Sequence, residues 1–260
     1  MVQSSVWLNG KPHPDAAVRM FCFPYAGAGS VVFHGWRRAL PELDVCGVEL
    51  PGRFERAREP PAASIEELVQ QLELHLEPYL NVTPTVLFGY SFGATLAFEL
   101  ARALRRRGRP VAGLIVAARA APQLARPLTL SQLNDDELLR RAQLQYGVIP
   151  SALLSDPDMR RYVANALRSD LRLLERHQYV PGEPLACPIL ACAGLEDRST
   201  TPDTVAAWSE QTSGEFRLET FASGHFFIRS HAPQLIERID AFVRRQIRPA
   251  HVPTVRSALP

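Results

Sequence analysis

A serine with a glycine two positions to either side, in the pentapeptide Gly89-Tyr90-Ser91-Phe92-Gly93, separates a short apolar run from a long amphipathic segment. The run Thr85-Val-Leu-Phe88 is typical of a buried strand. Residues 92–107 indicate a helix with a cationic last turn, closed by Gly108. The pattern G-x-S-x-G between a strand and a helix predicts a sharp turn that lifts the serine above the edge of a sheet. The chain is thereby restricted to folds in which a strand leads directly into a helix.

Further apolar runs and helical segments alternate along the chain. Helices are expected in a stretch that ends at Leu40, from Ser64 to about Tyr79 with Glu67 completing a capping box, and from Pro233 to Ile247. Five more strands are expected, at residues 18–23, 45–50, 114–117, 188–192 and 216–221. Short apolar strands that alternate with helices favour an α/β fold, with a mainly parallel sheet covered on both faces.

One segment interrupts the alternation. Residues 121–184 show only helical patterning, at 134–145 and 156–176, although they stand between two expected strands. We therefore expect one core domain formed by residues 1–120 and 185–248, with residues 121–184 inserted as a helical lid. The tail, residues 249–260, contains three prolines and little pattern, so it is expected to be mobile.

Composition excludes several classes of protein. The formal net charge is only +2, from 29 basic and 27 acidic residues, which is not the footprint of a nucleic-acid-binding domain. No run approaches about 18 consecutive apolar residues, so no transmembrane helix is expected. Residues 1–10 lack the pattern of a secretory signal. The four cysteines have neither C-x-x-C nor zinc-like spacing, and Cys22, Cys46 and Cys192 lie in expected strands. These features predict a cytoplasmic protein with reduced thiols, without a metal, and we expect a monomer.

The raised serine, Ser91, is a candidate nucleophile, and a serine hydroxyl needs a base to activate it. In this architecture the base is a histidine that comes late in the chain. His225 fits, because Gly224-His-Phe-Phe227 follows the strand that ends at Phe221 and precedes the last helix. His231, near the start of that helix, is the main rival. Structural roles are favoured for the other histidines, which are His13, His34, His75, His177 and His251.

The acid that orients the histidine should follow the preceding strand. Leu190-Ala-Cys-Ala-Gly-Leu-Glu-Asp197 ends a strand, which favours Asp197, although the neighbouring Glu196 remains an alternative. Some related hydrolases carry the acid one strand earlier. Residues 116–122 contain no carboxylate at that place, and this absence strengthens Asp197.

Hydrolysis through a serine also needs two backbone amides that stabilise an oxyanion. The amide of Phe92, directly after the nucleophile, is one candidate. The second is Ala26, in the Gly-rich loop 23–29 after the first central strand, although a plain tight turn is the alternative interpretation of these glycines. The loop is not a dinucleotide fingerprint, because it lacks the third glycine.

Taken together, these segments resemble the type II thioesterases, stand-alone editing enzymes of polyketide and nonribosomal peptide synthases. The resemblance extends from about Trp7 to Arg245, with Tyr90 in place of the usual bacterial histidine and Ala28 in place of a common glycine. It is carried by Phe21-Cys-Phe-Pro-Tyr-Ala-Gly-Ala-Gly-Ser30, Glu49-Leu-Pro-Gly-Arg53, the turn at Ser91, Gly194 to Asp197 and Gly224 to Phe227.

The resemblance implies an α/β-hydrolase fold with a mobile helical lid and no cofactor of its own. It further implies hydrolysis of aberrant acyl units held as thioesters on the phosphopantetheine arm of acyl or peptidyl carrier domains. Two alternatives stay open: a carboxylesterase or lipase acting on oxygen esters, and a non-catalytic hydrolase fold that serves as a binding module. The arginines of the insertion either lie on solvated helix faces or contact an acidic helix of the carrier domain. They are Arg126, Arg140, Arg141, Arg160 and Arg161.

Overall fold

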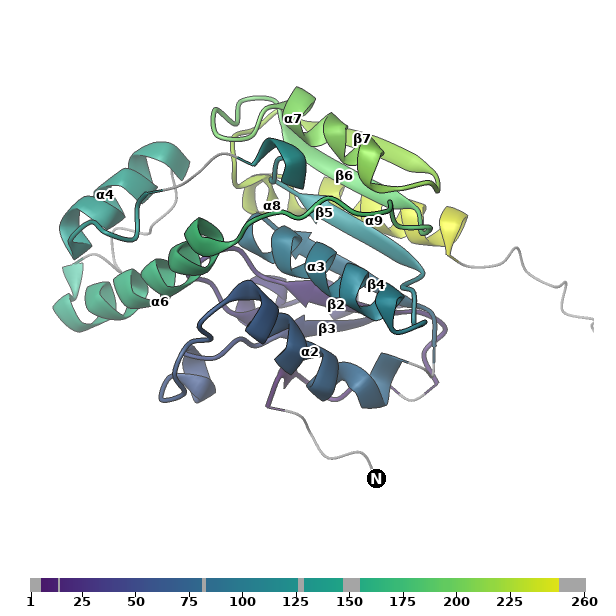
Figure 1. Ribbon diagram of the computed structural model, residues 1–260, viewed down its shortest axis with the longest axis horizontal. Helices are drawn as coiled ribbons and strands as arrows, with labels where there is room; N and C mark the ends of the chain where they lie inside the picture. The colour runs from purple at the N-terminus through teal and green to yellow at the C-terminus, as the bar shows by residue number, and fades with distance from the viewer. Residues whose placement is uncertain (1–5, 14, 81–82, 126–128, 147–154, 248–260) are drawn as a thin grey trace, which may run out of the picture.

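The computed structural model describes residues 6–13, 15–80, 83–125, 129–146 and 155–247 (Figure 1). Its centre is a seven-stranded sheet in the order β1-β3-β2-β4-β5-β6-β7, in which every pairing is parallel except that of β1 with β3. The strands are β1 (Leu8–Asn9), β2 (Arg19–Phe23), β3 (Asp44–Val48), β4 (Thr85–Tyr90), β5 (Gly113–Ala117), β6 (Ile189–Gly194) and β7 (Phe216–Phe221). The expected α/β fold with a mainly parallel sheet is confirmed, and the short edge strand β1 is an addition to it.

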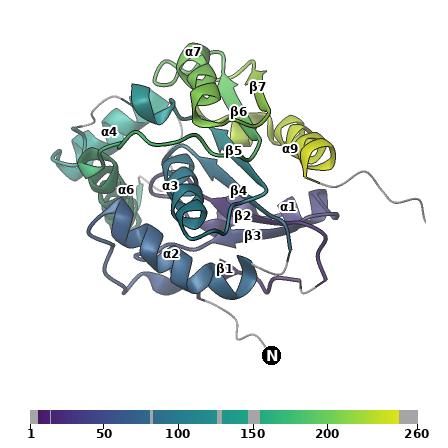
Figure 2. The ribbon, with the colours of Figure 1, turned by 45° about the vertical axis from the view of Figure 1, so that its right-hand side comes forward.

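Helices cover both faces of the sheet (Figure 2). On one face lie α2 (Ile65–Leu80) and α3 (Phe92–Arg106), and on the other lie α1 (Trp36–Ala39) and α9 (Ala232–Gln246). Shorter helical pieces connect these layers. They are η1 (Ser30–Phe33), η2 (Phe54–Arg56), η3 (Pro122–Leu124), α7 (Pro202–Ala206), η4 (Ala207–Gln211) and α8 (Phe227–Ser230).

The stretch that ends at Leu40 is helical as expected, but in two short pieces. The stretch divides into η1 and α1 because Gly35 between them adopts a φ of +85°, a left-handed conformation that interrupts a right-handed helix. The Ser64 cap of α2 is confirmed, since its hydroxyl accepts a hydrogen bond of 3.1 Å from the Glu67 amide.

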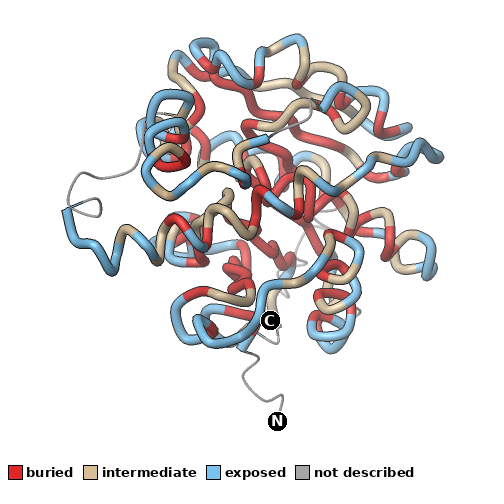
Figure 3. Tube along the Cα trace, turned by 60° about the vertical axis from the view of Figure 1, so that its left-hand side comes forward, coloured by how far each residue is buried: buried red, intermediate tan, exposed pale blue. Residues whose placement is uncertain are grey.

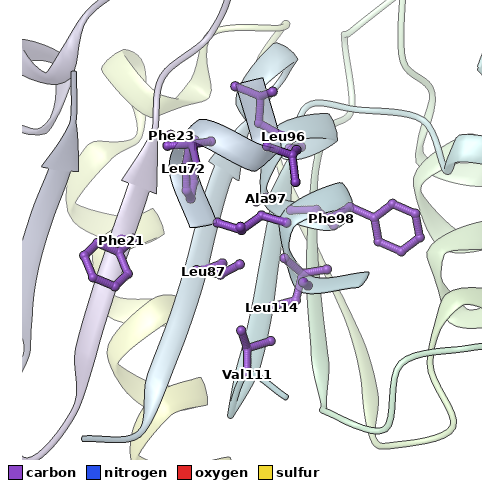
Figure 4. Close-up of a cluster of buried hydrophobic side chains, with 14 of the residues drawn as sticks. Phe21, Phe23, Leu72, Leu87, Leu96, Ala97, Phe98, Val111 and Leu114 are labelled. Carbon is purple, nitrogen blue, oxygen red and sulfur yellow. The ribbon is translucent and has the colours of Figure 1, made fainter. Parts of the chain in front are cut away.

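The central strands are buried on both faces, which explains why they are mostly apolar. Alternate residues divide between two hydrophobic layers: Phe21 and Leu87 pack under α2 and α3, whereas Met20 and Phe88 face α1 and α9. Figure 3 shows that buried residues follow the strands and the inner faces of the helices. Figure 4 shows the layer beneath α3, where Phe21, Leu87 and Leu114 lie on adjacent strands.

Between β5 and β6 the chain leaves the sheet and forms α4 (Asp135–Tyr146) and α6 (Pro157–Arg176), which pack against each other beside the carboxyl ends of the strands (Figure 1). Asp156 begins α6 by accepting hydrogen bonds from the amides of the first turn. Arg126 and the tail 249–260 lie outside the described residues. Within the described ranges, no helix is long and apolar enough to cross a membrane.

Candidate active site

The turn between β4 and α3 holds Ser91 in a strained conformation, with φ of 53° and ψ of −111°. The two glycines of the motif permit this close turn. A Cβ atom on Gly89 would lie 2.2 Å from the carbonyl oxygen of Gly93, and one on Gly93 would lie 2.1 Å from that of Phe23. The Ser91 amide donates a hydrogen bond of 2.8 Å to the Ala117 carbonyl of β5. These contacts place Ser91 at the carboxyl end of the sheet, beside the loop that follows β2.

The structure brings Ser91, His225 and Asp197 together from three separate turns. Ser91 Oγ lies 3.2 Å from His225 Nε2, and His225 Nδ1 lies 2.6 Å from Asp197 Oδ2. His225 and Asp197 are both buried, so water does not screen the contact between them. The serine hydroxyl, the imidazole and the carboxylate thus form a continuous hydrogen-bonded chain.

The carboxylate of Asp197 is kept ionised. Burial raises the pKa of this carboxyl, but hydrogen bonds from His225 and Ser199 outweigh burial and hold the pKa below its ordinary value. The amide and hydroxyl of Ser199 donate to Asp197 Oδ1 at 2.8 and 2.6 Å. Glu196, the alternative acid, is exposed, and its amide donates to the Ser223 carbonyl instead. Geometry therefore favours Asp197 over Glu196.

The loop that carries His225 is fixed from the serine turn itself. The buried hydroxyl of Tyr90 donates a hydrogen bond to the His225 carbonyl and accepts one of 3.3 Å from the Ile228 amide. His231, the rival base, forms a ring-nitrogen contact of 2.9 Å with Ser230 and packs against Phe221, away from the serine chain. The sequence pattern did not reveal this role of Tyr90, since a hydroxyl in the turn gives no indication of its partner 135 residues away.

The loop after β2 lies against the start of α3, as expected for an oxyanion site. Within the described residues, neither the Ala26 amide nor the Phe92 amide donates a hydrogen bond to a protein acceptor. Phe92 begins α3, whose N-terminus adds a positive dipole end at the same place. The two amides assigned from the sequence are thus available to a bound ligand, and their role stays a prediction.

A second buried carboxylate, which sequence reasoning missed, supports this loop. Asp170 of α6 accepts a hydrogen bond of 2.7 Å from the amide of Gly27, the residue after Ala26. The other oxygen of Asp170 pairs with the guanidinium of Arg53, and both side chains are buried. Burial raises the pKa of Asp170, while Arg53 and the Gly27 amide oppose that shift. Helix α6 is thereby bonded to the loop that carries the candidate oxyanion amide.

The last residue of α4 covers the histidine. The ring of Tyr146 lies 4.7 Å from the ring of His225, measured between centroids. In the described ranges, no three His, Cys, Asp or Glu side chains are grouped as a metal ion would require. The arrangement is suited to nucleophilic acyl transfer through serine, with a base, an orienting acid and amides for an oxyanion. Fold and site together define the class: an α/β-hydrolase.

Comparison with known proteins places the chain within that class. The family model of the thioesterase domain matches residues 18–243. The chain belongs to the thioesterase family, and it is an enzyme of the type that hydrolyses thioesters. This confirms the family indicated by the sequence motifs.

Several relatives are similar over most of their length. The gramicidin S biosynthesis protein GrsT of Aneurinibacillus migulanus is 33% identical over 97% of this chain and 98% of its own. Thioesterase PikA5 of Streptomyces venezuelae is 36% identical over 87% of this chain and 82% of its own. The solved structure of the type II thioesterase BorB from the borrelidin biosynthetic cluster is 37% identical, covers 94% of this chain and 100% of its own, and superimposes with a TM-score of 0.84.

Proposed function

We propose that this thioesterase removes aberrant acyl groups from the phosphopantetheine arms of carrier domains in a polyketide or nonribosomal peptide synthase. The observation that carries the proposal is the hydrogen-bonded chain from Ser91 through His225 to Asp197, in a protein of the thioesterase family. The names of the relatives support the setting, since GrsT belongs to gramicidin S biosynthesis and BorB is a type II thioesterase of the borrelidin cluster.

In the first half of the reaction, His225 Nε2 takes the proton of the Ser91 hydroxyl while Oγ attacks the thioester carbonyl. The tetrahedral oxyanion receives hydrogen bonds from the amides of Ala26 and Phe92. The carbon–sulfur bond then breaks, and the imidazolium returns the proton to the departing pantetheine sulfur. An acyl-serine remains on the enzyme.

In the second half, His225 takes a proton from water, and the resulting hydroxide attacks the acyl-serine carbonyl. Collapse of this second tetrahedral intermediate returns the proton to Ser91 Oγ and releases the carboxylic acid. Asp197 fixes the imidazole tautomer through its contact with Nδ1 and stabilises the imidazolium in both halves. From outside the chain, the two steps use the acyl-phosphopantetheine substrate and one water molecule.

The test compares Ser91→Ala with the wild type on propionyl-carrier-protein and on propionyl-pantetheine. We expect a loss of about 10⁴-fold or more in kcat for the variant, because the nucleophile is removed. Ser64→Ala is the matched control, since this serine caps α2 at some distance from the site. Hydrolysis undiminished in Ser91→Ala would refute the assignment of the nucleophile.

A second arm of the experiment distinguishes thioesterase activity from activity on oxygen esters. The wild type is assayed on a propionyl thioester of pantetheine and on the matched oxygen ester. Higher kcat/KM on the thioester supports the proposal, and preference for the oxygen ester would favour a carboxylesterase. Failure of a fluorophosphonate probe to label Ser91 would instead indicate a non-catalytic binding module.

A further inference from the structure

A cleft of about 460 Å³ lies between α3, the segment that follows β5 and the carboxyl-terminal end of α6. After α6 the chain crosses over α3 on its way to β6 (Figure 1), and Arg102 of α3 donates a hydrogen bond of 2.7 Å to the Val180 carbonyl at this crossing. The lining includes Thr95, Phe98, Arg119, Leu174, Tyr179 and Trp208. The cleft is therefore walled by apolar and aromatic side chains together with polar and charged ones.

The charged side chains in this lining differ in the partners with which they interact. Glu99 pairs with Arg102 at 3.2 Å and lies 3.4 Å from His177. Glu175 accepts hydrogen bonds from the amide and hydroxyl of Ser131. Among the described residues, no carboxylate lies within ion-pair distance of the guanidinium of Arg119. Within the described part of the chain, the guanidinium of Arg119 thus has no ion-pair partner, and Glu175 is the carboxylate of this lining that has none either.

The backbone fixes Arg119 in this position. It follows Ala118, which is held at a φ of +52°, and its carbonyl accepts a hydrogen bond of 2.8 Å from the buried indole of Trp208. The side chain is partly buried, and this burial lowers the pKa of the guanidinium. A desolvated cation of this kind is stabilised when an anion binds beside it.

The cleft begins close to the candidate catalytic residues. Thr95 stands on α3 one turn beyond Ser91, and Arg119 follows β5, whose Ala117 carbonyl accepts the Ser91 amide. The phenol of Tyr146 lies in the electrostatic field of Arg119, while its ring contacts that of His225. Tyr146 is therefore influenced by the charge of Arg119 and also contacts the candidate base.

We propose that Arg119 is a specificity-determining residue that binds an anionic group of the acyl-pantetheine substrate in this cleft. The anion is a carboxylate, at the far end of the acyl chain, or a phosphate, on the pantetheine arm, since both accept paired hydrogen bonds from a guanidinium. This inference rests on the proposed thioesterase reaction and extends it to the charge of the substrate.

The test uses four thioesters that combine the two charges. The acyl group is butyryl or succinyl, which have the same number of carbons but differ by a terminal carboxylate, and the carrier is pantetheine or phosphopantetheine. Wild type, Arg119→Gln and Arg119→Lys are compared on each. Arg172→Gln, which removes an exposed arginine from α6, is the matched control.

If Arg119 binds the acyl carboxylate, Arg119→Gln lowers kcat/KM for succinyl substrates by about tenfold or more relative to butyryl ones, on either carrier. If it binds the phosphate, Arg119→Gln lowers kcat/KM by a similar factor for phosphopantetheine substrates relative to pantetheine ones, with either acyl group. Arg119→Lys is expected to recover part of the loss, because it keeps the charge but not the paired donors.

Equal effects of Arg119→Gln on all four substrates would overturn the inference, because they would show a purely structural role. Butyryl-pantetheine, which carries neither anion, reports separately on the proposed function. Its hydrolysis by both wild type and Arg119→Gln, without discrimination by charge, would leave the thioesterase reaction intact and refute the anion site alone. Absence of hydrolysis of every thioester by the wild type would refute the proposed function, and the inference with it.

Discussion

The carboxylate of Asp170 accepts a 2.7 Å hydrogen bond from the amide of Gly27, although the two residues are 143 positions apart in the chain. Because Asp170 also pairs with the buried Arg53, α6 is bonded both to the loop that carries the candidate oxyanion amide of Ala26 and to the segment that follows β3. Asp170→Asn keeps an oxygen for Gly27 but removes the ion-pair partner of the buried Arg53. We expect a destabilisation of about 3 kcal/mol and a fall in kcat of about tenfold.

Chemical denaturation measures the first effect, and steady-state kinetics together with affinity for a boronic acid that mimics the tetrahedral intermediate measure the second. Asp158→Asn is the matched control, because Asp158 lies on the same helix with its side chain exposed. If Asp170→Asn destabilised the fold while kcat and boronate affinity stayed at wild-type values, α6 would have no influence on the oxyanion loop.

Substitution of Asp197 and of Glu196 distinguishes the two candidate acids directly. Asp197→Asn removes the charge that stabilises the imidazolium, so we expect kcat to fall by about 10³–10⁴-fold. Glu196→Gln changes an exposed side chain and should leave kcat within about twofold of the wild type. Kinetics on the same propionyl thioester provide the measurement, and a larger loss for Glu196→Gln would reverse the assignment.

Tyr90→Phe removes the hydroxyl that joins the serine turn to the His225 loop. The His225 carbonyl and the Ile228 amide would both lose a partner in a buried environment, which should cost about 1–3 kcal/mol of stability. A fall in kcat should accompany it, because the histidine is held less firmly. Tyr25→Phe is the control, since the Tyr25 hydroxyl contacts the exposed Arg229. Equal melting temperatures for the two variants would contradict this role of Tyr90.

Two histidines outside the site should give opposite pH dependences of stability. Contacts with Glu99 and Glu66 raise the pKa of His177 above its ordinary 6.5, despite burial. A raised pKa means that the stabilisation is present below the ordinary pKa and is lost as pH rises through the folded value. The difference in unfolding free energy between wild type and His177→Gln should therefore shrink from about pH 6 to about pH 9.

His75 serves as the comparison because burial and the nearby charge of Arg56 lower its pKa. Its neutral form is favoured in the folded state, so its contribution to stability is lost as pH falls. The wild-type advantage over His75→Gln should grow as pH rises from about 5 to about 7, in the direction opposite to that of His177→Gln. Parallel pH profiles for the two variants would contradict both directions.

Local sequence patterns predicted much of the fold, and contacts between distant segments account for what was missed. The strand before Ser91 and the helix after it are specified by neighbouring residues. In contrast, β1 has only two residues and forms by pairing Leu8 with Val48, forty positions away. The break at Gly35 depends on a backbone conformation that a helical pattern does not reveal.

The same distinction applies to the candidate site. Ser91, Asp197 and His225 each follow a strand, so the order of strands was sufficient to place them near one another. Asp170 looks in the sequence like any carboxylate on a helix, and only packing shows that it reaches Gly27. In the sequence, residues 116–122 were informative because they contain no carboxylate. The structure adds that Arg119, in the same segment, lines a cleft and has no ion-pair partner among the described residues.

The unequal attachment of the two inserted helices has a consequence for how such enzymes diversify. α6 is bonded to the core through Asp170, whereas the ion pairs that α4 forms with another described element run to α6, from Asp135 to Arg168 and from Asp136 to Arg160. Substitutions in α4 can therefore accumulate without disturbing the loop that carries Ala26. Laboratory evolution aimed at new substrates should concentrate its libraries on α4 other than Tyr146, whose ring contacts that of His225, and leave α6 unchanged.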